Sequence, residues 1–345
     1  MKKSLLTLLA LSASLCFSCG NDDLPDDHPL TNYSEKLVLF INEGNFLAGN
    51  ASISVYDREL GGQLDNAFEE INNRLLGDVA FSATSIDDHI YLVVNNSGKI
   101  EVLDPTSLES TSTISGLGSP RFVMETEEND LLVSDLFANA ITVLNKEDGT
   151  VKSTIDMPGW TEQFSGKSNP LVLLPNSPYI YRINSETNAI ADSVFAGANV
   201  YAMETDQSGT AWIARSEVPY DMTSMQLVGI DQDATEIAHS IDFTGGGGFH
   251  LKTAMASDGH TLYVLANNLY RFDTENPTLA PEIIVEAEGR NFYGLGIDPD
   301  NGDIYLSDAL DYVQNSPIYR FDSQATAIDT LSGGVATGSF YFYTN

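Results

Sequence analysis

The alternation of apolar and polar residues over positions 119–158 predicts four short strands in succession. These strands are expected at 122–126, 131–134, 140–144 and 151–155. An acidic segment separates the first two, and Asp148-Gly149 is a strong hairpin signal between the last two. No apolar period of 3.6 residues fits the segment. A unit of about 40 residues with four strands has the size of one β-propeller blade.

The same plan recurs along the chain. Similar units occupy 78–118, 199–241, 250–287 and 291–331, and 160–195 is a weaker copy whose first strand is short. The N-terminal part adds strands at 37–41 and 52–56 and a weak strand at 63–68, and 339–343 adds one spare strand. Pairing these ends in one blade removes the exposed edges. We therefore predict an all-β fold, a seven-bladed β-propeller closed by pairing of the N-terminal strands with the C-terminal strand.

An Asp or Asn residue ends the third strand of most units. Such side chains suit this position because they accept hydrogen bonds from the backbone of the turn that follows. The residues are Asp104, Asn145, Asn184, Asp231, Asp273 and Asp322.

The first 35 residues predict export and anchoring. Residues 1–18 combine two lysines with a short apolar run, which is typical of a signal peptide. Cys19, between Ser18 and Gly20, suits lipidation, although Cys16 stands where such signals usually carry Leu. The acidic segment 19–35 then reads as a tether, either a surface-export signal or a plain linker. The propeller is expected over 36–345.

A formal net charge of −33 limits the classes of partner that the protein can bind. Binding to nucleic acid is excluded because phosphate neutralisation needs clustered Lys and Arg. Membrane contact is expected through the lipid anchor only. The acidic surface favours a neutral or cationic ligand over an anionic one.

Long loops on one face of the ring are the expected binding region, because the loops between second and third strands and those between blades share that face. Aromatic residues on these loops can contact a ligand or can pin the loops to the blades. Basic and polar residues at the mouth of the central channel can bind a ligand or form structural salt bridges. The candidates are Asn42, Phe46, Asn95, Asn96, Arg121, Phe137, Trp160, Tyr220, Phe249, Lys252, Tyr293 and Tyr312, with Glu162 beside them.

Catalytic signals are weak. The five histidines offer no pair with metal-ligand spacing, and no nucleophile elbow or phosphate loop occurs. The segment 298–303 lacks the ligand set of a calcium loop and is better explained as a tight turn. We therefore expect no enzyme, no metal and no cofactor.

Five segments carry a resemblance to a known family: INEGNF at 41–46, ASISVYD at 51–57, LGD at 76–78, YLVVNNSGKIEVLD at 91–104 and GSFYF at 338–342. With them the chain resembles the YVTN-type surface propellers, and more closely the Bacteroidota surface lipoproteins that capture vitamin B12. This resemblance implies seven blades, display on the outer membrane and partnership with a TonB-dependent outer-membrane transporter. A small-molecule ligand of the corrinoid type is the expectation. The alternatives are an interaction or adhesion scaffold without a small ligand, and a propeller lyase or lactonase.

Overall fold

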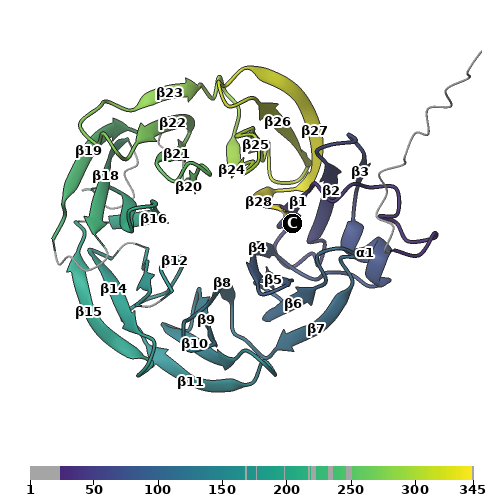
Figure 1. Ribbon diagram of the computed structural model, residues 1–345, viewed down its shortest axis with the longest axis horizontal. Coiled ribbons are helices and arrows are strands. Elements are labelled where there is room, and N and C mark those ends of the chain that lie inside the picture. Colours follow the sequence, from purple (N-terminus) through teal and green to yellow (C-terminus); the bar gives the residue numbers. More distant parts are fainter. Residues whose placement is uncertain are drawn as a thin grey trace, which may run out of the picture.

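A ring of seven four-stranded antiparallel sheets surrounds a central axis (Figure 1). The computed structural model describes residues 24–343 except 168, 176, 198, 217, 219–222, 232–235 and 246–250. The prediction of an all-β, seven-bladed propeller is confirmed. No helix among the residues that the structure describes is long and apolar enough to cross a membrane.

The blades follow one another along the chain, and in blades 2–7 the first strand lies nearest the axis. Blade 1 contains β28 (Thr337–Phe342), β1 (Leu37–Asn42), β2 (Ser52–Asp57) and β3 (Gln63–Leu64). Blade 2 contains β4 (Ala80–Ile86), β5 (His89–Val94), β6 (Lys99–Leu103) and β7 (Ser110–Ser115), and blade 3 contains β8 (Pro120–Glu125), β9 (Asp130–Asp135), β10 (Ala140–Asn145) and β11 (Val151–Asp156). Blade 4 contains β12 (Phe164–Ser165), β13 (Leu171–Val172), β14 (Tyr179–Asn184) and β15 (Ala189–Phe195), and blade 5 contains β16 (Asn199–Thr205), β17 (Thr210–Ser216), β18 (Ser224–Asp231) and β19 (His239–Thr244). Blade 6 contains β20 (Lys252–Met255), β21 (Thr261–Ala266), β22 (Asn268–Asp273) and β23 (Glu282–Val285), and blade 7 contains β24 (Phe292–Ile297), β25 (Ile304–Asp308), β26 (Asn315–Phe321) and β27 (Ala327–Val335).

Blade 1 closes the ring as the sequence predicts. The C-terminal strand β28 runs antiparallel to β1, in a register that opposes Val38 to Phe342 and Asn42 to Thr337. The chain supplies the innermost strand of this blade last and its three outer strands first. Because β28 pairs with β1, the inner side of β1 is not left as an exposed strand edge.

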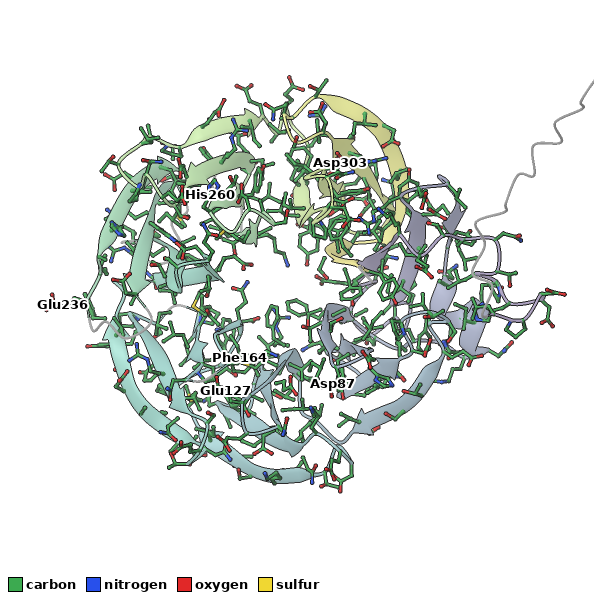
Figure 2. The ribbon with its side chains drawn as sticks, viewed as in Figure 1. Asp87, Glu127, Phe164, Glu236, His260 and Asp303 are labelled. Carbon is green, nitrogen blue, oxygen red and sulfur yellow. The ribbon has the colours of Figure 1, made fainter. Side chains whose placement is uncertain are left out.

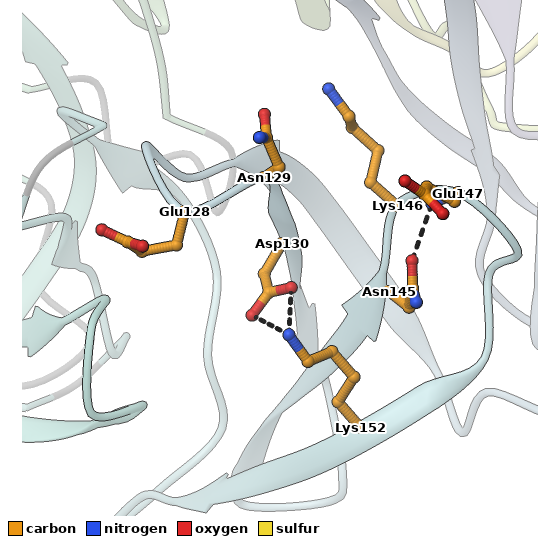
Figure 3. Close-up of a pocket in the computed structure, with 7 residues that line it drawn as sticks. All are labelled: Glu128, Asn129, Asp130, Asn145, Lys146, Glu147 and Lys152. Carbon is orange, nitrogen blue, oxygen red and sulfur yellow. Dashed lines mark hydrogen bonds and ion pairs between the residues drawn. The ribbon is translucent and has the colours of Figure 1, made fainter.

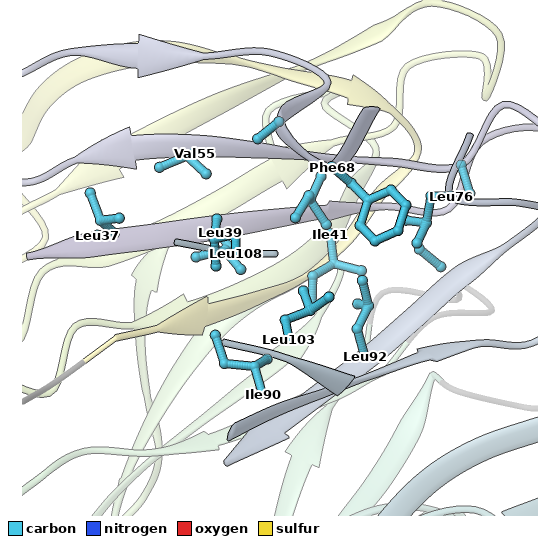
Figure 4. Close-up of a cluster of buried hydrophobic side chains, with 14 of the residues drawn as sticks. Leu37, Leu39, Ile41, Val55, Phe68, Leu76, Ile90, Leu92, Leu103 and Leu108 are labelled. Atoms are coloured by element: carbon cyan, nitrogen blue, oxygen red, sulfur yellow. The ribbon is translucent and has the colours of Figure 1, made fainter. Parts of the chain in front are cut away.

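The prediction of a strand at 63–68 is correct for its first two residues and wrong for the rest. Only Gln63–Leu64 is extended, and α1 (Ala67–Asn72) follows. Ala67, Phe68 and Ile71 lie on one side of this helix, and the first two are buried in the core between blades 1 and 2 (Figure 4). The helical spacing of these apolar residues explains why the segment leaves the sheet.

Blade 4 is the weakest blade, as expected, but two of its strands are short rather than one. The first and second strands have two residues each. Pro170 and Pro175 flank the second strand, and proline has no N–H group to extend a ladder. Leu173 and Leu174 remain buried beyond the strand, so the blade keeps its apolar packing.

The Asp and Asn residues that end the third strands accept hydrogen bonds from the turns after them. Asp104 Oδ1 accepts from the backbone N–H groups of residues 106 and 107, and Asp322 Oδ1 accepts from those of residues 324 and 326. The same bond recurs at Asn145, Asn184 and Asp273. The residues directly after Asp231 lie outside the described ranges.

Candidate functional site

The long loops meet on one face, and hydrogen bonds fasten each loop to its neighbour. The Asn45 amide donates to the carbonyl oxygen of Tyr312 at 2.5 Å, which joins blade 1 to blade 7. The backbone N–H of Leu47 donates to Asp78 at 2.9 Å, and that of Thr161 donates to the carbonyl oxygen of Asp135 at 3.0 Å. These bonds hold the walls of a site in place.

A pocket of about 330 Å³ opens between these loops. Blades 1, 2, 3 and 7 all contribute to its wall. Six of the residues singled out from the sequence line it, which are Phe46, Asn95, Asn96, Phe137, Tyr293 and Tyr312. We call this the loop-face pocket.

Aromatic side chains form the rim of the loop-face pocket. Phe46 is 68% exposed and Phe137 is 72% exposed, although both are large and apolar. Tyr312 packs edge-on against Tyr293, with ring centroids 5.5 Å apart. Exposed rings of this size on neighbouring loops are typical of a contact surface.

Two asparagines line the side of the pocket in blade 2. The Asn95 amide donates to the carbonyl oxygen of Pro120 at 2.9 Å, and the Asn96 amide donates to Asp78 at 2.6 Å. In the described part of the chain no donor reaches either amide oxygen. Each side chain is therefore oriented by the scaffold and retains an acceptor for a ligand.

Beneath the pocket, charged residues from four blades converge near the axis. We call Glu43, Arg121, Glu162, Lys252 and Tyr293 the axial cluster. The Tyr293 hydroxyl donates to Glu43 at 2.7 Å, and Arg121 Nε donates to both oxygens of Glu162 at 2.9 and 3.0 Å. For Arg121, the structure thus supplies the salt bridge that was the alternative to ligand contact.

Burial changes the protonation of this cluster. It raises the pKa of Glu43 and of Glu162 against the lowering effect of the nearby cations. It lowers the pKa of the Lys252 ammonium and raises that of the Tyr293 hydroxyl well above its usual range. All four shifts favour the neutral forms, as expected where side chains leave bulk water without full pairing.

Two residues of this region were missed from the sequence. Glu43 lies in the segment 41–46, which carries part of the family resemblance, but no sequence pattern indicates its role. Phe81 places its ring centroid 3.4 Å from the Arg121 guanidinium and 5.4 Å from the Lys252 ammonium. Gly338 allows the Glu43 carboxylate to lie against the backbone of β28, since a Cβ at position 338 would lie 2.3 Å from Glu43 Oε1.

The other candidates lie elsewhere. Asn42 is fully buried in blade 1, where its amide donates to Ser52 and Ser54 and accepts from Gly334 and Thr337. We assign it to the scaffold, because strand β1 extends through it and turns it inward. Trp160 is half-buried, and its indole N–H has no acceptor among the residues described. Tyr220, Phe249 and the predicted lipidation site Cys19 lie outside the described ranges.

A larger groove, of about 420 Å³, lies on the opposite face at the turns of blade 3 (Figure 3). Its lining is polar, and Lys152 pairs with both oxygens of Asp130 at 2.6 and 2.7 Å. Lys146 is paired as well, with Asp87 and Glu125 outside the lining, and no aromatic residue lines the groove. We therefore place the candidate site on the loop face.

A group of possible metal ligands also lies at turns away from the loop-face pocket. Ligand atoms of His260, Asp273 and Glu275 lie within 4.8 Å of one another, and Figure 2 shows where His260 sits in blade 6. Asp273 accepts hydrogen bonds from the turn that follows it. The turn thus already uses one of these carboxylates.

Solved structures share the ring architecture at low sequence identity. A quinonprotein alcohol dehydrogenase-like protein from Bacteroides thetaiotaomicron aligns with a TM-score of 0.67 and 11% identity, covering 90% of this chain and 78% of that one. Hydrazine synthase from Kuenenia stuttgartiensis aligns with a TM-score of 0.65 and 12% identity, covering 76% and 92%. Virginiamycin B lyase from Staphylococcus aureus, solved as an inactive variant with quinupristin, gives 0.57 and 12%, covering 74% and 84%. At such identities the likeness concerns the fold alone.

Sequence comparison gives a sharper result. None of the curated proteins matches the chain. A family model described as a domain of unknown function, DUF5074, matches residues 37–342, which is nearly the whole propeller. The chain belongs to the DUF5074 family.

Proposed function

We propose that this protein is a ligand-capturing surface lipoprotein that binds a small nutrient in the loop-face pocket. The observation that carries the proposal is the pocket itself, whose lining combines the exposed rings of Phe46 and Phe137 with Tyr312 and the oriented amides of Asn95 and Asn96. In the finer form of the proposal the nutrient is a corrinoid. A lipid on Cys19 anchors the protein to the outer membrane, and the ligand passes to a TonB-dependent transporter.

The lining fits a ligand with a flat apolar body and polar arms. A ring that covers Phe46, Phe137 and Tyr312 removes apolar area from water, and each well-buried contact contributes on the order of 1–3 kcal/mol. Amide arms at the edge of the ligand pair with the asparagine oxygens, which avoids burying an unpaired polar group. A corrinoid is larger than the pocket, so it would lie across the rim and insert only part of its periphery.

An equilibrium titration of the purified mature protein with cyanocobalamin tests the proposal. Phe137→Ala should weaken binding about tenfold or more, equivalent to about 1.4 kcal/mol. Leu60→Ala is the matched control, because Leu60 is also an exposed apolar residue, at 54%, but follows β2 in a turn away from the pocket. Both variants should keep the melting temperature of the wild type.

The outcomes separate the candidate functions. Binding that Phe137→Ala weakens and Leu60→Ala leaves unchanged supports ligand capture on the loop face. No binding of cyanocobalamin or related corrinoids removes the corrinoid form of the proposal. Equal binding by both variants moves the site away from the loop-face pocket.

Anchorage is tested separately. Cys19→Ala should move the protein from the membrane fraction to the soluble fraction and leave the propeller folded. Unchanged partitioning would exclude a lipid on Cys19. Affinity purification of the lipidated protein from its own membranes should recover an outer-membrane transporter.

A further inference from the structure

Lys252 differs from every other described lysine in its pairing. Lysines 36, 99, 146, 152 and 167 each form an ion pair with a carboxylate. The ammonium of Lys252 forms no ion pair and no hydrogen bond within the described part of the chain. In a sequence with 49 acidic residues, an ammonium without a carboxylate partner is an exception that needs a reason.

The surroundings of Lys252 hold the ammonium in a fixed place. Lys252 begins β20, a strand next to the axis, and its Nζ lies 5.4 Å from the ring centroid of Phe81 and 5.7 Å from that of Tyr293. Two aromatic faces at this distance attract a cation but accept none of its hydrogen bonds in the way a carboxylate does. The three N–H donors of the ammonium therefore remain available.

The nearby carboxylates are already engaged. Glu43 accepts the hydroxyl of Tyr293, and Glu162 holds Arg121. Arg121 lies close enough to add a like charge that further lowers the pKa of Lys252. Both acids of the axial cluster thus bind other partners, and the Lys252 ammonium has no carboxylate in contact with it among the described residues.

Lys252 adjoins the loop-face pocket. Tyr293 belongs to both, since its ring lies beside Lys252 and also lines the pocket wall, and Glu43 lines the pocket as well. Lys252 is half-buried, so water reaches it. Lys252 is not itself a lining residue, and Tyr293 is the side chain that links the pocket to the ammonium.

We propose that the ligand of the loop-face pocket carries an oxyanion group, such as a carboxylate or a phosphate, that binds the ammonium of Lys252. The inference rests on the proposed function and adds the chemical class of the ligand. It differs from the expectation based on net charge, which favours neutral or cationic ligands. The overall charge of −33 slows the approach of an anion, but a cation that touches the bound anion decides its affinity.

Proton uptake accompanies the binding. With all four ionisable partners charged, Glu43, Glu162, Arg121 and Lys252 sum to zero, and an added anion makes the site negative. Glu43 can take up this proton, because burial raises its pKa and the Tyr293 hydroxyl is the one hydrogen-bond donor to it among the described residues. Binding of the anion should therefore weaken as the pH rises and Glu43 loses its proton, and loss of the proton from Lys252, whose pKa burial lowers, acts in the same direction.

Two fluorescent probes of matched shape test the inference. Anilinonaphthalene sulfonate is an aromatic anion, and phenylnaphthylamine is its neutral counterpart without the sulfonate. The wild type should bind the anion about tenfold more tightly than the neutral probe, since a hydrogen bond between ionised groups exceeds one between neutral groups. Lys252→Met should abolish the preference by weakening the anion alone, and Lys252→Arg should retain it.

Controls locate the effect. Lys36→Met removes an exposed lysine that is paired with Asp300, and it should leave both affinities unchanged. Phe137→Ala should weaken both probes equally. Raising the pH from about 6 to about 9 should weaken the sulfonate, which stays ionised throughout, and leave the neutral probe unaffected.

The results distinguish a failure of the anionic inference from a failure of the proposed binding pocket. Equal affinity of the wild type for the two probes, or a preference that survives Lys252→Met, overturns the anionic inference and leaves the pocket standing. Probe binding that Phe137→Ala does not change, or no binding of either probe, overturns the pocket and the inference together. Circular dichroism melting of each variant verifies that the comparison is made on folded protein.

Discussion

Glu101 in blade 2 and Glu43 beneath the loop-face pocket are both enclosed glutamates, but they are partnered very differently. Glu101 is fully buried and accepts hydrogen bonds from Arg74, Lys99, Ser110 and Thr113 at 2.5–2.9 Å. Burial alone would raise its pKa, but these four donors outweigh burial and lower the pKa to about 2. At Glu43 burial prevails, and the pKa is raised.

The number of hydrogen-bond donors to the carboxylate distinguishes a structural ion cluster from a binding site. A carboxylate with a complete set of donors gains nothing from a further partner, so the network around Glu101 serves the fold. The axial cluster leaves Glu43 with a single hydrogen-bond donor and Lys252 without an acceptor among the described residues. Incomplete pairing near the axis costs stability and is maintained where a ligand completes it.

The largest effect expected concerns Glu101. Glu101→Gln removes the charge from a buried network and leaves two cations unpaired, which should lower the free energy of unfolding by about 3 kcal/mol. Glu282→Gln is the matched control, because Glu282 is 61% exposed and pairs with Arg271 on the surface. Urea titrations at neutral pH measure both. Equal effects of the two substitutions would contradict the comparison.

The same network predicts the response to acid. The pKa of Glu101 is about 2 in the folded protein and about 4.5 when unfolded, so its contribution is complete above pH 4.5 and is lost as the pH falls toward 2. The wild type should thus exceed Glu101→Gln in stability by about 3 kcal/mol at pH 6 and by clearly less at about pH 3.5. A difference that is constant over this range would show that hydrogen bonding, and not charge, carries the effect.

Ring closure, blade number and the Asp and Asn residues after the third strands could be predicted because each depends on a local pattern that repeats. The exposed aromatics followed from their place on long loops. Asn42 could not be placed, because one residue decides between the end of β1 and the loop after it. The axial cluster could be predicted only in part, since the ring brings Phe81 and Lys252 together from blades 2 and 6, and no pattern in the sequence indicates that contact.

A third glutamate, Glu204, is enclosed with still fewer partners than Glu43 among the described residues. Glu204 lies on β16 next to the axis, no hydrogen bond to its carboxylate is found in the described ranges, and burial raises its pKa to about 8. Because the folded pKa exceeds the unfolded one, stability is lost as the pH rises from about 4.5 to about 8. Glu204→Gln should therefore be more stable than the wild type by about 1–3 kcal/mol at pH 9 and equal to it at pH 4.

Thermal melts over this pH range measure the effect of Glu204. Glu186→Gln, on the exposed turn between β14 and β15, is the control and should follow the wild type at every pH. A Glu204→Gln variant that is less stable than the wild type at pH 9 would mean that the carboxylate has a charged partner in the folded protein.

The smallest effect expected concerns the stability of Lys252→Met. Lys99→Met removes one of the donors of Glu101 and should lower the free energy of unfolding by about 1–3 kcal/mol, the usual cost of losing a hydrogen bond to a buried charged group. Lys252 has no such bond to lose, and methionine fills the space between Phe81 and Tyr293 without burying a charge. Lys252→Met should therefore change stability by less than about 1 kcal/mol, in either direction. Urea titrations of the two variants, made side by side, measure the contrast. If Lys252→Met lowers the free energy of unfolding as much as Lys99→Met does, the Lys252 ammonium supports the fold. The axial cluster would then resemble the network around Glu101.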